Sequence, residues 1–156
     1  RKGMQKIKVF LICTAVIFLI GTAGLTAQSM NIIDDLLESK TADFGTSVYM
    51  IAVGSGIVDE SVSISEAVNT ISEKKWNKSG KNTGDPITIG EMSFITMKAL
   101  KIHGGLMYSL IPSGRYAVRE FAYLGLIEGR VHPNDEMTGA DVLNILSQAI
   151  ALKEAE

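Results

Sequence analysis

The sequence predicts an all-α protein built from stacked helix-loop-helix repeats. Aromatic residues make up 6% of the chain and hydrophobic residues 46%, a composition that suits packed helices better than a β-sandwich or barrel. Three segments share one opening pattern, in which an apolar residue precedes a hydroxyl residue and an acid follows three positions after the hydroxyl. A glycine followed by two aliphatic residues precedes two of these segments, as expected where a helix stops and the chain re-enters a core.

The shared opening pattern predicts three capped helices. The hydroxyl groups of Ser63, Thr88 and Thr138 can each accept a hydrogen bond from a free amide of the first turn, and the acid can reach back to the amide of the capping residue. The acid also meets the positive end of the helix dipole. One such capping box is common by chance, but three in a short chain indicate a repeated unit. The predicted helices cover residues 63–75, 88–102 and 138–153.

Apolar periodicity and helix-breaking residues predict three further elements, at residues 30–40, 44–58 and 113–124. The first places four aliphatic side chains on one face, as in a helix that docks on a core: Ile32, Ile33, Leu36 and Leu37. The second is a short helix or a strand closed by glycines, and the helix is favoured. The third stops at Gly125.

The N-terminal segment is typical of a secretory signal peptide. Lys6 and Lys8 give it a basic start, residues 9–20 are apolar, and residues 21–27 are mostly small. We therefore expect cleavage after Ala27 and export to the periplasm or the cell surface. The alternative is an uncleaved membrane anchor, because the weakly apolar residues 21–27 lengthen the run to about the span of a bilayer.

Residues 28–156 are expected to form one helical domain, with a polar linker at residues 72–86. Removal of residues 1–27 takes away four basic residues and no acid, which changes the formal charge from −2 to −6. This balance argues against nucleic acid and against an anionic membrane surface as the main partner. A membrane is expected only if the N-terminal segment stays attached. The only cysteine, Cys13, leaves with the signal, so no disulfide is expected.

The second half of the chain resembles the S-layer homology module, a helical repeat of envelope proteins. The matching segments follow the order of that module: Tyr116-Ala117 at a helix start, Gly125-Leu126-Ile127-Glu128-Gly129 at a helix stop, a Pro133-Asn134 turn, and Met137-Thr138-Gly139-Ala140-Asp141 opening the next helix. The segment at 87–91 looks like the same opening in the preceding repeat, and residues 56–67 look like a worn earlier copy.

The resemblance implies a non-catalytic module that binds peptidoglycan or another cell-wall polymer in grooves between repeats. The family-matched positions are the pairs Thr88 with Glu91 and Thr138 with Asp141, together with Tyr116, which stands where the family usually has tryptophan. The arginine that the family associates with anionic polymer is replaced here by Ile89 and Gly139. We hypothesise that Arg115 supplies the missing positive charge.

Trp76 is a further candidate ligand residue, because it lies in a polar run with Lys74, Lys75, Lys78 and Lys81. Its ring could stack on a sugar while the lysines meet an anionic polymer. Alternatively, this run is a solvated helix end and linker, with Trp76 folded back on the core.

Signatures of enzymes and metal sites are incomplete, so no catalytic residue, cofactor or metal is predicted. His103-Gly104-Gly105 is similar to an esterase oxyanion strand, but the sequence has no Gly-x-Ser-x-Gly elbow. A calcium loop starting at Asn134 would require an acid where Ile145 stands. The competing function is a structural or assembly protein that binds another envelope protein through its helical surface.

Overall fold

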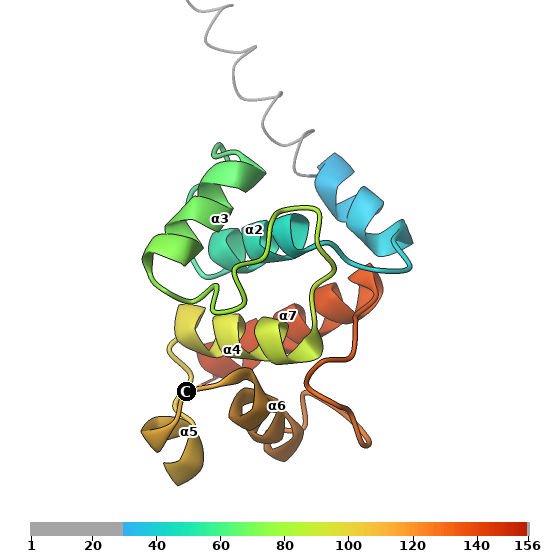
Figure 1. The fold of residues 1–156 in the computed structure, drawn as a ribbon. Helices are drawn as coiled ribbons and strands as arrows, with labels where there is room; N and C mark the ends of the chain where they lie inside the picture. The colour runs from blue at the N-terminus through green and yellow to red at the C-terminus, as the bar shows by residue number, and fades with distance from the viewer. Residues whose placement is uncertain (1–29, 156) are drawn as a thin grey trace, which may run out of the picture. The chain divides into compact units, whose positions relative to one another are not determined.

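The computed structural model describes residues 30–155, so the predicted signal peptide at residues 1–27 lies outside the described residues. Within residues 30–155 there are seven helices and no strand, which confirms the all-α class. The first helix covers residues 30–38, and the others are α2 (Phe44–Gly54), α3 (Ile64–Glu73), α4 (Ile89–Ala99), α5 (Leu106–Leu110), α6 (Gly114–Tyr123) and α7 (Gly139–Glu154) (Figure 1). Residues from Asp35 onward form one compact unit.

Each predicted helix is present, and its observed ends fall inside the predicted range except at α7, which ends one residue later, at Glu154. The segment at 44–58, for which a strand was the alternative, is helical in α2. The short helix α5 was not predicted, because the pair Gly104-Gly105 precedes it and no side chain caps it.

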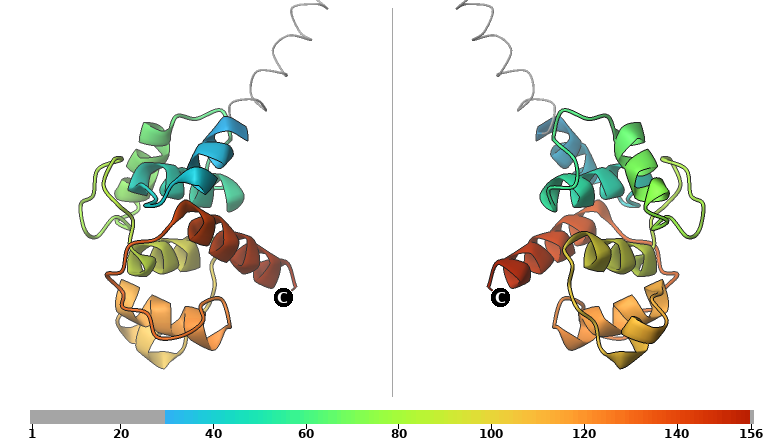
Figure 2. Two further views of the ribbon diagram at one scale, coloured as in Figure 1. Left: turned by 90° about the vertical axis from the view of Figure 1, so that its right-hand side faces the viewer. Right: turned by 90° about the vertical axis from the view of Figure 1, so that its left-hand side faces the viewer.

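Helix α4 lies at the centre of the compact unit and packs against α2, α6 and α7 (Figures 1 and 2). Its buried residues lie all around the helix and include every position from Met92 to Met97. A helix that is apolar on all sides is expected in a core. The apolar side chains of this segment therefore belong to the core.

The starts of α2, α4 and α7 meet in a closed ring of three backbone hydrogen bonds. The amide of Ala42 donates to the carbonyl of Met137 (2.8 Å), that of Met137 to Ile87 (3.3 Å), and that of Ile87 to Ala42 (2.9 Å). All three side chains are buried, with exposures of 4% or less. Each residue directly precedes a helix cap, so the ring brings three caps that are far apart in sequence to one place.

The predicted capping boxes are complete at one of the three helices. Thr88 accepts a hydrogen bond from the Glu91 amide, and the Glu91 carboxylate accepts one from the Thr88 amide. Ser63 and Thr138 also accept the first bond, from the amides of Glu66 and Asp141, but no return bond to the backbone is made there. Asp141 has one methylene fewer than Glu91, and its carboxylate accepts a bond from the Thr138 hydroxyl at 2.7 Å instead.

Four helices end in the same left-handed turn. Gly56 after α2 and Gly125 after α6 have φ angles of 70° and 75°, and Lys75 after α3 and Lys101 after α4 have φ angles of 59° and 55°. After each turn an amide returns to a carbonyl of the last helical turn, as when the Leu126 amide donates to Phe121 at 2.8 Å. Such turns satisfy helix-end carbonyls. The predicted glycine stops are thus confirmed, and two lysines adopt the same conformation.

Local structure recurs fifty positions apart in the chain. The Asn82 amide donates to the Asp85 carboxylate at 2.7 Å, and the His132 amide donates to the Asp135 carboxylate at 2.8 Å. The first turn is followed by Ile87 and Thr88 and the second by Met137 and Thr138, which are in each case a residue of the hydrogen-bonded ring and the threonine that caps the next helix. The buried side chains of α3 and α6 occur at the same spacing, Ala67, Val68 and Ile71 in one and Ala117, Val118 and Phe121 in the other.

Candidate functional site

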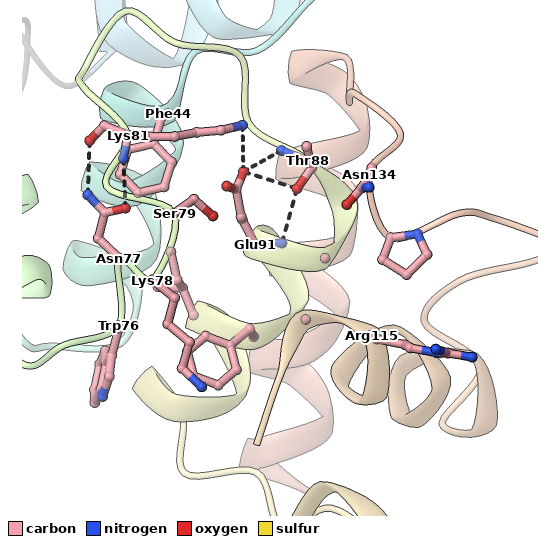
Figure 3. A pocket seen from close by; sticks show the side chains of 15 residues that line it. Phe44, Trp76, Asn77, Lys78, Ser79, Lys81, Thr88, Glu91, Arg115 and Asn134 are labelled. Carbon is pink, nitrogen blue, oxygen red and sulfur yellow. Dashed lines mark hydrogen bonds and ion pairs between the residues drawn. The ribbon is translucent and has the colours of Figure 1, made fainter. Parts of the chain in front are cut away.

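A cleft of about 400 Å³ lies at the N-terminal end of α4 (Figure 3). Its walls come from the loop after α3, the first turns of α4 and α6, and the turn at Pro133 and Asn134. Four of the seven residues predicted to bind ligand line it: Trp76, Thr88, Glu91 and Arg115. Segments distant in sequence thus converge on one surface.

Close backbone packing shapes one wall of this cleft. A Cβ atom on Gly114 would lie 2.8 Å from the Gly90 carbonyl oxygen, and one on Gly90 would lie 2.7 Å from the Pro133 carbonyl oxygen. Real Cβ atoms do not approach backbone oxygens so closely, so glycine is required where α6 and the 133–134 turn meet α4. These contacts fix the first turn of α4 against two neighbouring segments.

The carboxylate of Glu91 is the centre of the polar network in the cleft. One of its oxygens accepts bonds from Lys81 Nζ at 2.8 Å, from the Thr88 amide at 2.9 Å and from the Thr88 hydroxyl at 3.0 Å. Burial tends to raise the pKa of Glu91, but the bonds donated by Lys81, Thr88 and Ser79 outweigh it and lower this pKa below its ordinary value. Glu91 is therefore ionised at neutral pH.

The run at residues 72–86, expected to be a polar linker, contains the end of α3 and a loop that supplies one side of the cleft. The Asn77 side chain holds it, because its amide oxygen accepts a bond from the Lys81 amide (3.0 Å) and its amide nitrogen donates to the Lys81 carbonyl (2.9 Å). Lys81 is thereby placed to reach Glu91. The loop geometry follows from these paired bonds across four residues.

Trp76 and Lys78 lie on aromatic and apolar surfaces at the edge of the cleft. Trp76 is half-buried against the core, with the Lys74 ammonium 5.5 Å from its ring centre. The Lys78 ammonium lies 4.5 Å from the ring centre of Phe94 and also donates to the Pro112 carbonyl. Packing on the core and lining of the cleft, which were alternative interpretations of Trp76, are thus compatible.

The cleft carries a net positive charge on an acidic chain. Lys78, Lys81 and Arg115 line it together with a single carboxylate, that of Glu91, which gives a formal charge of +2. Arg115 is exposed and extends away from the Glu91 and Lys81 pair (Figure 3). The cation that contacts the matched carboxylate is therefore Lys81. The lysine-rich composition of the loop indicated Lys81 as a candidate, but its contact with Glu91 depends on the fold.

The other three predicted residues lie elsewhere. Tyr116 lines a separate hollow beside α5, together with Arg119 and Glu120. Thr138 is exposed as the cap of α7. Asp141 lines a second cleft, of about 480 Å³. The structure therefore does not join the two hydroxyl and acid pairs into one site.

Many residues that line the second cleft lie fifty positions after residues that line the first, but their side chains differ in charge and polarity. Glu128 stands at the position of Lys78, Val131 at that of Lys81, Leu126 at that of Trp76 and Asn144 at that of Phe94. Its four acids are Glu128, Asp135, Glu136 and Asp141. Among residues 30–155 no three acids, histidines or cysteines are placed to hold a metal ion.

No known protein family, curated protein or solved structure matches the chain. In the region from residue 30 to residue 155, no helix combines the length and the apolar character needed to cross a membrane.

Proposed function

We propose that this chain is an exported, non-catalytic envelope module that binds an anionic cell-wall glycan in the cleft at the start of α4. The observation that carries this proposal is the convergence of Trp76, Lys78 and Lys81 on one cleft of an otherwise acidic chain. A half-buried indole offers a flat apolar face for a sugar ring. Two lysines beside it provide charge for carboxylate or phosphate groups of the polymer.

The proposal includes an architecture of three degenerate repeats of the S-layer homology type. Their openings would be Ala42-Asp43, Ile87-Thr88 and Met137-Thr138, which are the residues joined by the hydrogen-bonded ring and the caps that follow. Ala42-Asp43 takes the place of the earlier copy expected at residues 56–67. The recurrence of turns and core positions fifty residues apart supports the same assignment. In this arrangement the cleft lies between the second repeat and its neighbours.

Glu91 has two roles in the proposed site. Its ionised carboxylate holds Lys81 at 2.8 Å, which fixes the position of that ammonium before a ligand arrives. Its remaining acceptor capacity allows it to accept a hydrogen bond from a sugar hydroxyl, since a carboxylate accepts bonds at both oxygens. Arg115 also lines the cleft, apart from the Glu91 and Lys81 pair, and adds positive charge to that part of its wall.

The direct test is cosedimentation of the protein with purified sacculi that retain their anionic polymer, at low and high salt. We expect retention that weakens as salt rises, because the contacts are partly electrostatic. Lys78→Gln and Trp76→Ala should each reduce retention several-fold, while Lys40→Gln, an exposed lysine outside the cleft, should not. Absence of retention at both salt concentrations would end the glycan proposal. A stoichiometric protein partner in its place would favour the assembly function.

A further inference from the structure

A group of large apolar side chains is exposed on and beside α5. Among residues 30–155, five of the seven exposed large hydrophobic residues gather here: Leu106 (75% exposed), Met107 (54%), Leu110 (68%), Ile111 (58%) and Tyr123 (86%). We call this group the α5 face. Helices α5 and α6, which carry it, lie in Figures 1 and 2 at the end of the compact unit opposite α2 and α3.

The exposure follows from how α5 is anchored. Tyr108 is its only buried residue, and its ring packs against Phe94 with ring centres 6.4 Å apart. Gly104 allows this contact, because a Cβ there would lie 2.6 Å from the Tyr108 ring. A helix of five residues fixed through a single aromatic ring holds its other apolar side chains outward. The α5 face is therefore presented by the fold and is not a frayed end of the core.

Two cations, Lys98 and Arg119, lie beside this apolar group. Between Glu91 and Glu120 the sequence contains no acid but has four basic residues, Lys98, Lys101, Arg115 and Arg119. The Lys98 ammonium lies 5.7 Å from the Tyr108 ring centre, and Arg119 lines one hollow with Leu106, Met107 and Tyr123. Glu120, which lines the same hollow, is the one nearby acid. Local charge is thus positive on a chain whose overall charge is −2.

We propose that the α5 face docks on a membrane surface that carries anionic lipid headgroups. Exposed leucine, isoleucine and methionine side chains would enter the boundary between headgroups and acyl chains, and Lys98 and Arg119 would meet lipid phosphates. The negative net charge of the chain argues against such a surface. However, only charges close to the bilayer interact with it strongly, because salt screens charges beyond about 10 Å.

Charge and chemistry favour this occupant over two others. A two-fold dimer through the α5 face would bring its cations against those of the second copy, which is unfavourable. A polysaccharide would make no use of four exposed aliphatic side chains. The α5 face is also separate from the glycan cleft, since no residue of the face lines that cleft. The inference therefore stands or falls independently of the proposed function.

Site-directed fluorescence in the full chain tests this inference. With Trp76 replaced by Phe, Leu106→Trp places a single indole on the α5 face, and Asn69→Trp places one at an exposed position of α3. Each variant is mixed with vesicles of phosphatidylcholine, with or without phosphatidylglycerol, that contain acyl-chain-brominated lipid. We expect quenching and a blue shift for Leu106→Trp in anionic vesicles and little change for Asn69→Trp. Both variants carry the apolar segment at residues 9–20, so its insertion alone cannot produce the difference.

Charge substitutions provide the second arm. In the Leu106→Trp background, Lys98→Gln and Arg119→Gln should each lower the bound fraction about fivefold at low lipid, the effect of about one surface cation. Lys40→Gln, away from the α5 face, should leave it unchanged. Equal quenching at positions 69 and 106, or none at 106 with anionic lipid, would overturn the proposal. Concentration-dependent dimerisation that buries residue 106 would also overturn it and identify a second copy as the occupant.

Discussion

Replacement of Glu91 by glutamine isolates the contribution of the charged network at the start of α4. Glutamine keeps the size of the side chain and one acceptor oxygen, so the helix and its packing are preserved. It removes the negative charge that accepts bonds from Lys81 and from the Thr88 amide and hydroxyl. It also leaves the half-buried Lys81 ammonium without its carboxylate.

The magnitude follows from these contacts. A hydrogen bond to a charged group contributes about 1.5–3 kcal/mol, and an acid at a helix N-terminus contributes about 0.3–1 kcal/mol. Because glutamine retains part of the bonding, we expect Glu91→Gln to lower the free energy of unfolding by about 2 kcal/mol. The matched control is Glu66→Gln at the Ser63 cap, where the acid is exposed and makes no return bond. Only its dipole interaction is lost, about 0.5 kcal/mol.

Urea unfolding as a function of pH tests the reasoning. The folded-state pKa of Glu91 lies below its ordinary value of about 4.3, so its stabilisation is complete above about pH 5 and is lost as pH falls through the folded-state pKa. The stability gap between wild type and Glu91→Gln should therefore close as the solution becomes more acidic. A gap that is equal at pH 7 and at pH 3, or one no larger than that of Glu66→Gln, would refute a charge network at this cap.

Three other predictions concern packing, backbone strain and the second cleft. Gly139→Ala should prevent stable folding, because its Cβ would lie 1.6 Å from the Leu36 carbonyl oxygen; Gly84→Ala, where nothing lies within 4 Å, should change the urea midpoint little. Lys101→Gly should raise the free energy of unfolding by about 1 kcal/mol in the same assay, since it relieves a left-handed lysine, and a decrease would contradict this account of the turn. The triple variant Leu126→Trp, Glu128→Lys and Val131→Lys gives the second cleft the tryptophan and lysines of the first. It should create a second site for anionic glycan and double the binding stoichiometry measured by calorimetry. An unchanged stoichiometry would show that these side chains are insufficient.

The helices were predictable because their signals are local. Capping residues, apolar periodicity and glycine stops act within one or two turns, and each can be found within a short window of sequence. The lysine turns at 75 and 101 were not predictable in this way, because lysine rarely adopts a left-handed conformation and the surrounding bonds impose it. Helix α5 was missed for a related reason, since Tyr108 stabilises it through contact with the distant Phe94.

The candidate site was only partly predictable because it is assembled from five segments that are distant in the sequence. Matching positions in the sequence grouped Thr138 and Asp141 with Thr88 and Glu91, although the fold places the pairs at different helix starts. Sequence proximity joined Trp76 to the lysines, and the structure places all but Lys74 and Lys75 of that group on the cleft. The pairing of Lys81 with Glu91 depends on the turn that the Asn77 side chain stabilises. No sequence pattern predicts that turn.

The opposite charges of the two clefts argue that shared backbone geometry does not fix shared binding. Lys75 and Gly125 hold the same left-handed turn, and Asp85 and Asp135 close the same kind of loop. The backbone therefore presents equivalent walls fifty positions apart, while the side chains on them differ at almost every exposed position. Because the acids of the second cleft repel an anionic polymer that the lysines of the first would attract, only one of these two clefts would be attractive to it. On this reasoning the acids of the second cleft confine such a ligand to a single register on the molecule.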